Sequence, residues 1–311
     1  MKTGKEGLVV KSTGSWYRVR LDDGERIDAR VRGKLRVQGI QSTNPVAVGD
    51  RVKLNTKTEG DWTIVEVCDR QNYIVRKATK LSKQTHIIAA NIDLAIALVT
   101  LTHPKLKLGF LDRVLVSTEA YGIETIIVFN KIDLLNTEEK EYLNQLCKAY
   151  NDVGYETRQI SVQAEQGIDQ IRQIVKNKIC AISGHSGVGK SSLLNVLSPE
   201  HRAQVTDVST FNSKGQHTTT FAEMYEVDES TFIIDTPGIK SFGLSTMDRE
   251  ELKGFFPEMH RLSVNCKFHN CLHINEPGCA VKPAFENSQL PWFRYENYVH
   301  LFDELKEQNP L

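Results

Sequence analysis

Along the first seventy residues, hydrophobic and polar positions alternate in short runs that are separated by turns. A period of two is typical of a strand with one buried face, and Asp22-Asp23-Gly24 supplies a hairpin turn between two of the runs. The expected strands cover residues 7–11, 15–21, 26–31, 46–54 and 62–68. About five strands without a long helix between them predict a small β-barrel of the oligonucleotide-binding type.

From about Gln71 the pattern changes to apolar runs that alternate with amphipathic segments. The expected strands are 94–101, 124–129, 155–162, 178–183 and 231–234, and the expected helices are 110–121, 138–151 and 168–177. This alternation predicts an α/β domain with a mainly parallel, doubly wound sheet. A last segment combines cysteines with aromatic helical stretches. We therefore expect three domains, 1–70, 71–245 and 246–311.

Composition is that of an ordinary globular protein, with 40% hydrophobic and 25% charged residues. The 39 basic side chains equal the 39 acidic ones, which excludes a polycation as a whole. No apolar run approaches the roughly 20 residues that a membrane-spanning helix needs, and the apolar run near the N-terminus is too short for a signal peptide. The default expectation is a cytoplasmic monomer without a membrane partner.

Local charge is less even, because residues 1–70 carry 14 Lys and Arg against 10 Asp and Glu. In an extended chain, basic residues at every second position project from one face. They are Arg18, Arg20, Arg30, Arg32, Lys34 and Arg36. The pattern fits either the solvated outer face of a barrel or a surface that follows RNA phosphates, and alternation alone leaves both interpretations open.

Residues 184–191 match the phosphate-binding pattern G-x-x-x-x-G-K-[ST] without departure. An apolar strand enters the loop and the apolar segment 192–197 leaves it as a helix, which is the setting this motif requires. The backbone would surround the phosphates, Lys190 would reach the β and γ groups, and Ser191 would bind Mg²⁺. The expected nucleotide contacts are Gly184, His185, Ser186, Gly187, Val188, Gly189, Lys190, Ser191 and Ser192.

Two further motifs follow predicted strands. The first, Asp235-Thr236-Pro237-Gly238, offers a carboxylate for the Mg²⁺ shell and a glycine N–H for the γ-phosphate. The second, Asn130-Lys131-Ile132-Asp133, indicates guanine, since the Asp133 carboxylate can accept from both N1–H and the N2 amino group while the Lys131 stem lies along the base. Because these residues indicate guanine, they disfavour an ATPase or a small-molecule kinase.

The order of the motifs is inverted relative to conventional GTPases, in which the phosphate loop comes before the guanine-binding segment. Here residues 130–133 precede residues 184–191, which precede residues 235–238. The chain therefore resembles a circularly permuted GTPase. Permutation can keep the same site, because the termini of compact domains often lie close together.

A cysteine cluster near the C-terminus has the spacing Cys266-x4-Cys271-x-His273-x5-Cys279. Three thiolates and one imidazole form the donor set of a closed tetrahedral Zn²⁺ site, which has no open position for catalysis. The metal would stabilise a fold that the local sequence cannot support alone. His269 is a competing fourth ligand.

A barrel, a permuted GTPase and a Cys3His module in this order resemble the RsgA family of small-ribosomal-subunit-dependent GTPases. Further similar stretches are 215–220, 266–273, 276–281 and 294–298. The resemblance favours His273 over His269 as the zinc ligand. It implies binding to the small ribosomal subunit and its rRNA, assistance in late maturation, and hydrolysis of GTP to GDP and phosphate when the subunit stimulates it. Ser161 would lie beside the base, although Val162 replaces the usual alanine.

The mechanism expected from these residues is charge stabilisation. Mg²⁺ would be held by Ser191 and by Thr219, or by its neighbours Thr218 or Thr220, with Asp235 supporting the metal shell. Ile239 occupies the position at which many GTPases carry a glutamine that orients water, so we expect slow intrinsic turnover and assign water positioning to His217. The alternative function is a nucleotide-gated binding protein of another RNA–protein assembly, with incidental hydrolysis.

Overall fold

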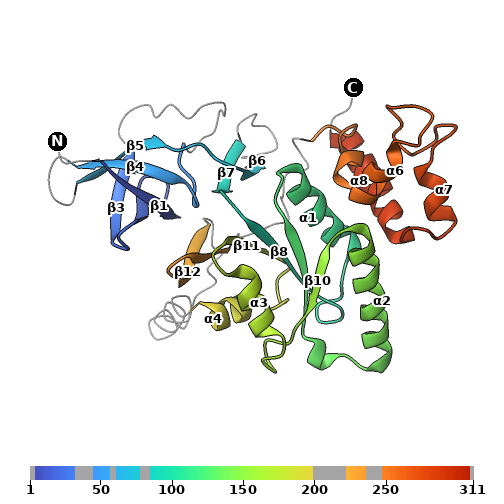
Figure 1. Ribbon diagram of the computed structural model, residues 1–311, viewed down its shortest axis with the longest axis horizontal. Coiled ribbons are helices and arrows are strands. Elements are labelled where there is room, and N and C mark those ends of the chain that lie inside the picture. The colour runs from blue at the N-terminus through green and yellow to red at the C-terminus, as the bar shows by residue number, and fades with distance from the viewer. Residues whose placement is uncertain are drawn as a thin grey trace. The chain divides into compact units, whose positions relative to one another are not determined.

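The computed structural model describes residues 4–31, 45–56, 61–77, 85–198, 222–235 and 247–308 (Figure 1). The chain divides into two compact units. The first contains residues 1–96, 168–183 and 189–241, and the second contains residues 97–167, 184–188 and 242–311. The predicted division at residues 70 and 245 stays a prediction.

The first unit begins with a closed five-stranded barrel, as predicted. Antiparallel pairs join neighbours around it, except for one parallel pair between β3 and β5, and β4 closes the barrel on β1. Its strands are β1 (Lys5–Ser12), β2 (Tyr17–Leu21), β3 (Arg26–Val31), β4 (Arg51–Thr56) and β5 (Trp62–Val67). Residues of one parity fill the interior; in β2, Tyr17, Val19 and Leu21 are buried.

One barrel strand is shorter than predicted. The apolar residues 46–48 belong to a buried turn instead, and β4 begins only at Arg51. The fully buried Asp50 accepts the backbone N–H of Ala47 at 2.8 Å and pairs with Arg70 at 2.7 Å. Burial of the turn imitates the apolar pattern of a strand, which explains the error.

An antiparallel hairpin follows the barrel, formed by β6 (Tyr73–Lys77) and β7 (Thr85–Ala90). The sequence pattern did not predict it, nor the strand β12 (Glu223–Asp228). In the first unit the strands continue in the order β8 (Leu94–Thr100), β11 (Ile179–Ser183), β13 (Thr231–Asp235), β12 and β1. The pair β11–β13 is parallel, whereas β12 is antiparallel to both of its neighbours. The helices in the described part of this unit are α3 (Ile168–Val175) and α4 (Lys190–Leu197).

The second unit takes the end of β8 and adds two strands, β9 (Thr125–Asn130) and β10 (Glu156–Gln159), which pair in parallel. Every residue of β8 and β9 is buried, as expected for central parallel strands between helices. The remaining elements are α1 (Leu108–Ala120), η1 (Ile132–Leu134), α2 (Thr137–Val153), η4 (Leu252–Phe255), α6 (Pro257–Ser263), α7 (Val281–Glu286) and α8 (Trp292–Gln308). Within the described ranges, no helix has both the length and the apolar character needed to cross a bilayer.

A buried ionic cluster joins four helices of the second unit. Arg294 of α8 donates to Asp112 of α1 at 2.6 Å and to Glu258 of α6 at 2.7 Å, and all three side chains are fully buried. Tyr150 of α2 and Asn297 donate to the two oxygens of Asp112. Burial would lower the pKa of Arg294, but the two carboxylates raise it well above its usual range. The arginine therefore stays charged and holds the helices in one arrangement.

Replacement of Arg294 by methionine leaves two buried carboxylates without their cation. We expect the free energy of unfolding of the second unit to fall by about 3–5 kcal/mol, measured by urea titration. Lys148→Met removes an exposed ion pair with Asp152 and should change stability by less than about 0.5 kcal/mol. Equal losses in the two variants would contradict the role of the cluster.

Candidate functional site

The loop 184–191 lies between β11 and α4, as the motif requires. A Cβ on Gly184 would lie 2.2 Å from the carbonyl oxygen of Leu98, so only glycine allows this close approach. Gly189 has a φ of +100° and is the N-cap of α4. Strand, loop and helix therefore bring the backbone N–H groups of one tight turn together, which suits binding of phosphate.

The guanine-binding motif contacts this loop directly. Asn130, the last residue of β9, donates from Nδ2 to the carbonyl oxygen of Val188 at 2.9 Å. Lys131 has a left-handed φ of +65° and donates from Nζ to the carbonyl oxygens of Gly187 at 2.7 Å and His103 at 2.8 Å. All of these residues belong to the second unit. The inverted order in sequence thus does not separate the two motifs in space.

Asp133 is held by a neighbouring loop. The Ser161 hydroxyl donates to Oδ1 of Asp133 in a short contact, and the same Ser161 oxygen accepts from the backbone N–H of Ala164 at 3.0 Å. Val162 donates its backbone N–H to Oδ1 of Asn130 at 3.1 Å. Val162 takes part in this arrangement through its backbone N–H, which a valine supplies as well as an alanine would.

In the first unit, Lys190 and Asp235 interact electrostatically. Burial lowers the pKa of Lys190, and the Asp235 carboxylate opposes this shift. Asp235 ends β13 in register with Ile182 of β11, two residues before the phosphate loop. A carboxylate and the Ser191 hydroxyl are hard oxygen donors of the kind that Mg²⁺ prefers, so the donor set fits this ion.

Several predicted residues lie outside the described ranges, and their roles stay predictions. They are Arg32, Lys34, Arg36, His217, Thr218, Thr219, Thr220, Gly238 and Ile239.

The described basic residues of the barrel are engaged by acidic groups. Arg18 pairs with Asp28 at 3.1 Å, and Arg20 pairs with Glu226 at 3.3 Å and is only 16% exposed. Arg30 stacks on the indole of Trp16 at 4.4 Å. The even basic ridge expected from alternation is therefore interrupted at Arg20, whose guanidinium faces another strand of the same unit.

The Cys3His group is assembled in the second unit. The ligand atoms of Cys266, Cys271, His273 and Cys279 lie within 4.8 Å of one another. Nδ1 of His273 is 3.7 Å from the sulfur of Cys266 and 3.6 Å from that of Cys279. Tetrahedral zinc with ordinary bond lengths separates a sulfur and a nitrogen ligand by about 3.6 Å, so the geometry fits Zn²⁺. His269 is exposed and is not a member of the group.

The surroundings of the cluster also suit a metal. Burial lowers the pKa of His273 to about 4, which keeps the imidazole neutral, and burial raises the pKa of Cys271 to about 12. A buried thiolate needs a cation, and zinc supplies one. Backbone N–H groups of Ala280 and Lys282 point to two of the sulfurs at 3.3 and 3.4 Å.

The ligand loop is fixed from two sides. The Glu276 carboxylate accepts the backbone N–H groups of residues 272, 274 and 275 at 2.8, 3.0 and 3.1 Å. From α8, the Tyr295 hydroxyl donates to the carbonyl oxygen of His273 at 2.8 Å, and the Tyr298 hydroxyl donates to that of Leu272. The loop that carries the Cys3His group and the Arg294 cluster are therefore both held by α8.

Comparison with known sequences settles the family. The profile of the RsgA GTPase matches residues 67–245, and the profile of the RsgA N-terminal domain matches residues 6–64. The chain belongs to the RsgA GTPase family. It is 46% identical to the small ribosomal subunit biogenesis GTPase RsgA 2 of Bacteroides thetaiotaomicron, over 97% of each chain. It is also 46% identical to the RsgA of Flavobacterium johnsoniae, over 96% of this chain and 92% of that protein.

Solved structures of the family have the same fold. YjeQ from Thermotoga maritima is 32% identical, with a TM-score of 0.79 over 97% of this chain and 99% of the other. YloQ, described as a circularly permuted GTPase, is 28% identical, with a TM-score of 0.77 over 100% and 98% of the two chains. The permuted GTPase fold inferred from motif order is confirmed.

The sequence reasoning missed Phe110 and His103, which contact the predicted residues His185 and Lys131. The His185 ring stacks on Phe110 of α1 at 3.7 Å between centroids, and the His103 carbonyl accepts from Lys131. Residues 101–107 follow the carboxyl end of β8, which is the edge of an α/β sheet where ligands bind. Its position just after the end of a predicted strand was the signal in the sequence that could have identified His103.

Zinc content tests the ligand assignment. The purified protein should contain one zinc per chain by mass spectrometry, and His273→Ala should lose most of it, because three ligands remain. His269→Ala is the matched control, since that exposed imidazole lies outside the group, and it should keep its zinc. The reverse pattern would show that the fourth ligand is misassigned.

Base recognition by Asp133 can be tested by exchanging its acceptor for a donor. We expect Asp133→Asn to weaken GTP binding about 100-fold and to improve binding of xanthosine triphosphate, whose C2 oxygen accepts from an amide. Asp169→Asn is the control, because Asp169 is almost fully exposed on α3. Unchanged preference in Asp133→Asn, measured by competition, would rule out its role in reading the base.

Proposed function

We propose that this protein binds the small ribosomal subunit, assists its late maturation in the cytoplasm, and hydrolyses GTP to GDP and phosphate when the subunit stimulates it. The relatives named above are small ribosomal subunit biogenesis GTPases. The observation that carries the nucleotide assignment is the pair of hydrogen bonds from Asn130 and Lys131 to the phosphate-loop carbonyls of Val188 and Gly187. They bring a guanine-binding motif to a phosphate-binding motif.

The guanine end of the nucleotide is assigned to four residues, Asn130, Lys131, Asp133 and Ser161. Asn130 and Lys131 use their polar ends to hold the loops, which leaves the Lys131 stem for the base plane. The Asp133 carboxylate is exposed and is oriented by Ser161, so it can accept the two guanine donors. Adenine has no such pair of donors, and GTP is the substrate we infer.

The phosphate end is assigned to the loop 184–192, with Lys190 facing the β and γ groups. Mg²⁺, when bound, neutralises charge on the phosphates, and Ser191, Asp235 and Thr219 are the residues that would hold it. Burial lowers the pKa of Lys190 toward the neutral form, so the Asp235 carboxylate and the phosphates help to keep this side chain charged. Gly238 would donate its N–H to the γ-phosphate, and His217 would position water.

Turnover by the isolated protein should be slow, since Ile239 cannot orient a water molecule. Binding of the subunit would complete the arrangement of groups that positions the water molecule. The barrel and the Cys3His module are the surfaces we assign to rRNA or ribosomal protein. Structured RNA is contacted mainly through its backbone and shape, which a moderately basic surface can follow.

Purified small subunits should raise GTP turnover by about 100-fold or more at low salt, in the range of known activators of GTPases. The stimulation should fall steeply across a salt series, because contacts with phosphate release counterions. Heparin at matched charge is the control polyanion. Equal stimulation by heparin, or none by subunits, would favour the nucleotide-gated binding protein of another assembly.

A further inference from the structure

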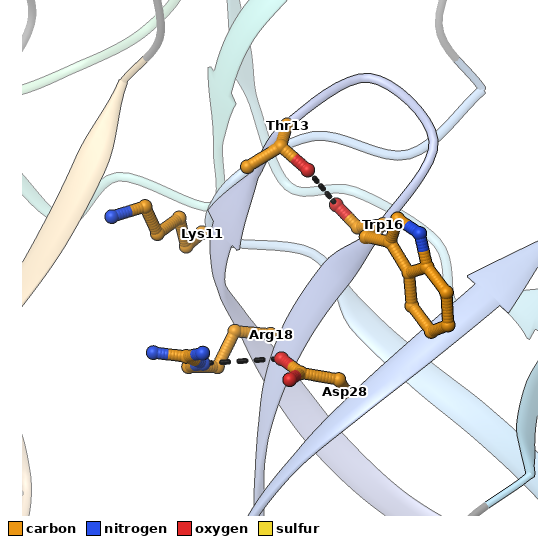
Figure 2. Close-up of a pocket in the computed structure, with 5 residues that line it drawn as sticks. All are labelled: Lys11, Thr13, Trp16, Arg18 and Asp28. Atoms are coloured by element: carbon orange, nitrogen blue, oxygen red, sulfur yellow. Dashed lines mark hydrogen bonds and ion pairs between the residues drawn. The ribbon is translucent and has the colours of Figure 1, made fainter.

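A groove on the barrel, here called the barrel groove, is lined by Lys11, Thr13, Trp16, Arg18 and Asp28 and has a volume of about 370 Å³. The Lys11 and Arg18 side chains are 41% and 51% exposed and extend to the same side in Figure 2, whereas the indole of Trp16 lies on the other. Asp28 is the only acid among these five residues. Two exposed cations on one side of the groove and an indole on the other suit the phosphates and bases of single-stranded RNA.

Besides lining the groove, Lys11 forms an ion pair with an acidic residue of β12 in the same unit. Its ammonium group is 2.6 Å from Oε1 of Glu223, the first residue of β12, and these two residues are also register partners of β1 and β12. The Glu223 side chain is only 17% exposed, and its other oxygen accepts from the Tyr225 hydroxyl at 3.3 Å. Lys11 therefore lines the groove and neutralises a half-buried carboxylate at once.

Glu223 lies opposite Asp235 in the register of β12 and β13. Opposite residues of an antiparallel pair project from the same face with their Cβ atoms about 4.5–5.5 Å apart, where like charges repel. Lys11, Glu223 and Asp235 thus form one row across three neighbouring strands. Beyond the row, Asp235 raises the pKa of Lys190 through its charge.

Among the described residues, the other ion pairs between the barrel and β12 differ in position. Arg20 and Arg26 contact Glu226 at 3.3 and 2.8 Å. The register partner of Glu226 is Phe232, which carries no charge. Both glutamates therefore join the barrel to β12, but Glu223 is the one whose charge lies opposite Asp235. Glu226 is a matched control for the mechanical part of the connection.

We propose that Lys11 is a positioning residue shared between the barrel groove and this row. A phosphate of single-stranded RNA in the groove draws the Lys11 ammonium group away from Glu223. The negative charge of Glu223 is then no longer neutralised, and it strengthens the attraction of Asp235 for Mg²⁺. RNA binding on the barrel is thereby linked to the metal that accompanies the nucleotide. The inference rests on the proposed function, because it concerns regulation of that same site.

The test follows release of a fluorescent methylanthraniloyl derivative of GDP across a Mg²⁺ series, with octauridylate as the RNA probe. In the wild type, octauridylate should lower the Mg²⁺ concentration that half-maximally slows release by about two- to five-fold. Lys11→Met should show that lowered requirement without RNA and should not respond further. Glu223→Gln should keep the wild-type requirement or a higher one and should also lose the response.

The control variant Glu226→Gln, which removes the other ion pairs with the barrel, should respond to octauridylate as the wild type does. An unchanged Mg²⁺ requirement in Lys11→Met, or the same reduction in Glu226→Gln, would overturn the proposal. Inorganic phosphate at matched phosphate concentration should have no effect; a full effect would overturn recognition of an RNA strand.

Lys11→Arg serves as the conservative variant and should retain the response, which separates a charge effect from misfolding. Failure of subunits to stimulate turnover would refute the proposed function while leaving the shift in Lys11→Met measurable without subunits. A normal subunit effect together with no shift in Lys11→Met would refute this inference alone.

Discussion

The hydrogen bonds from Asn130 and Lys131 to the carbonyls of residues 188 and 187 are the constraint on which the nucleotide site depends. Each bond uses a side chain at the carboxyl end of one strand and a backbone oxygen of the loop that follows another. Because Val188 is buried and its carbonyl oxygen needs a partner, the contact from Asn130 also stabilises the loop. Chain order is irrelevant to such a contact, and a permuted sequence can therefore form the same site.

The C-terminal part of the second unit contains a buried ionic cluster and the Cys3His group. Arg294 keeps α1, α6 and α8 together through Asp112 and Glu258. Two tyrosines on the same α8 hold the backbone of the Cys3His loop. These helices also share an apolar core that includes Val116, Met259 and Leu301, and the ion pairs fix the arrangement of the helices around it.

Patterns along the chain predicted most of the strands and helices but failed where burial was not strand-like. Residues 46–48 are apolar because a turn is buried, not because they form a strand. The hairpin β6–β7 and the strand β12 were missed because short strands near turns give little periodicity. The predicted basic ridge included Arg20 but did not foresee its acidic partner Glu226, which is about two hundred residues away in sequence.

By itself the sequence determined the motifs: a phosphate-loop pattern, the tetrapeptide 130–133 in inverted order, and three cysteines with one histidine within fourteen residues. These signals are local, because each depends on residue type and spacing within a short segment. Tertiary structure decided which of two histidines joins the cysteines, what holds Ser161 against Asp133, and that Lys11, Glu223 and Asp235 lie in one row. Those relations depend on strand register and burial, which bring together residues that no pattern along the chain connects.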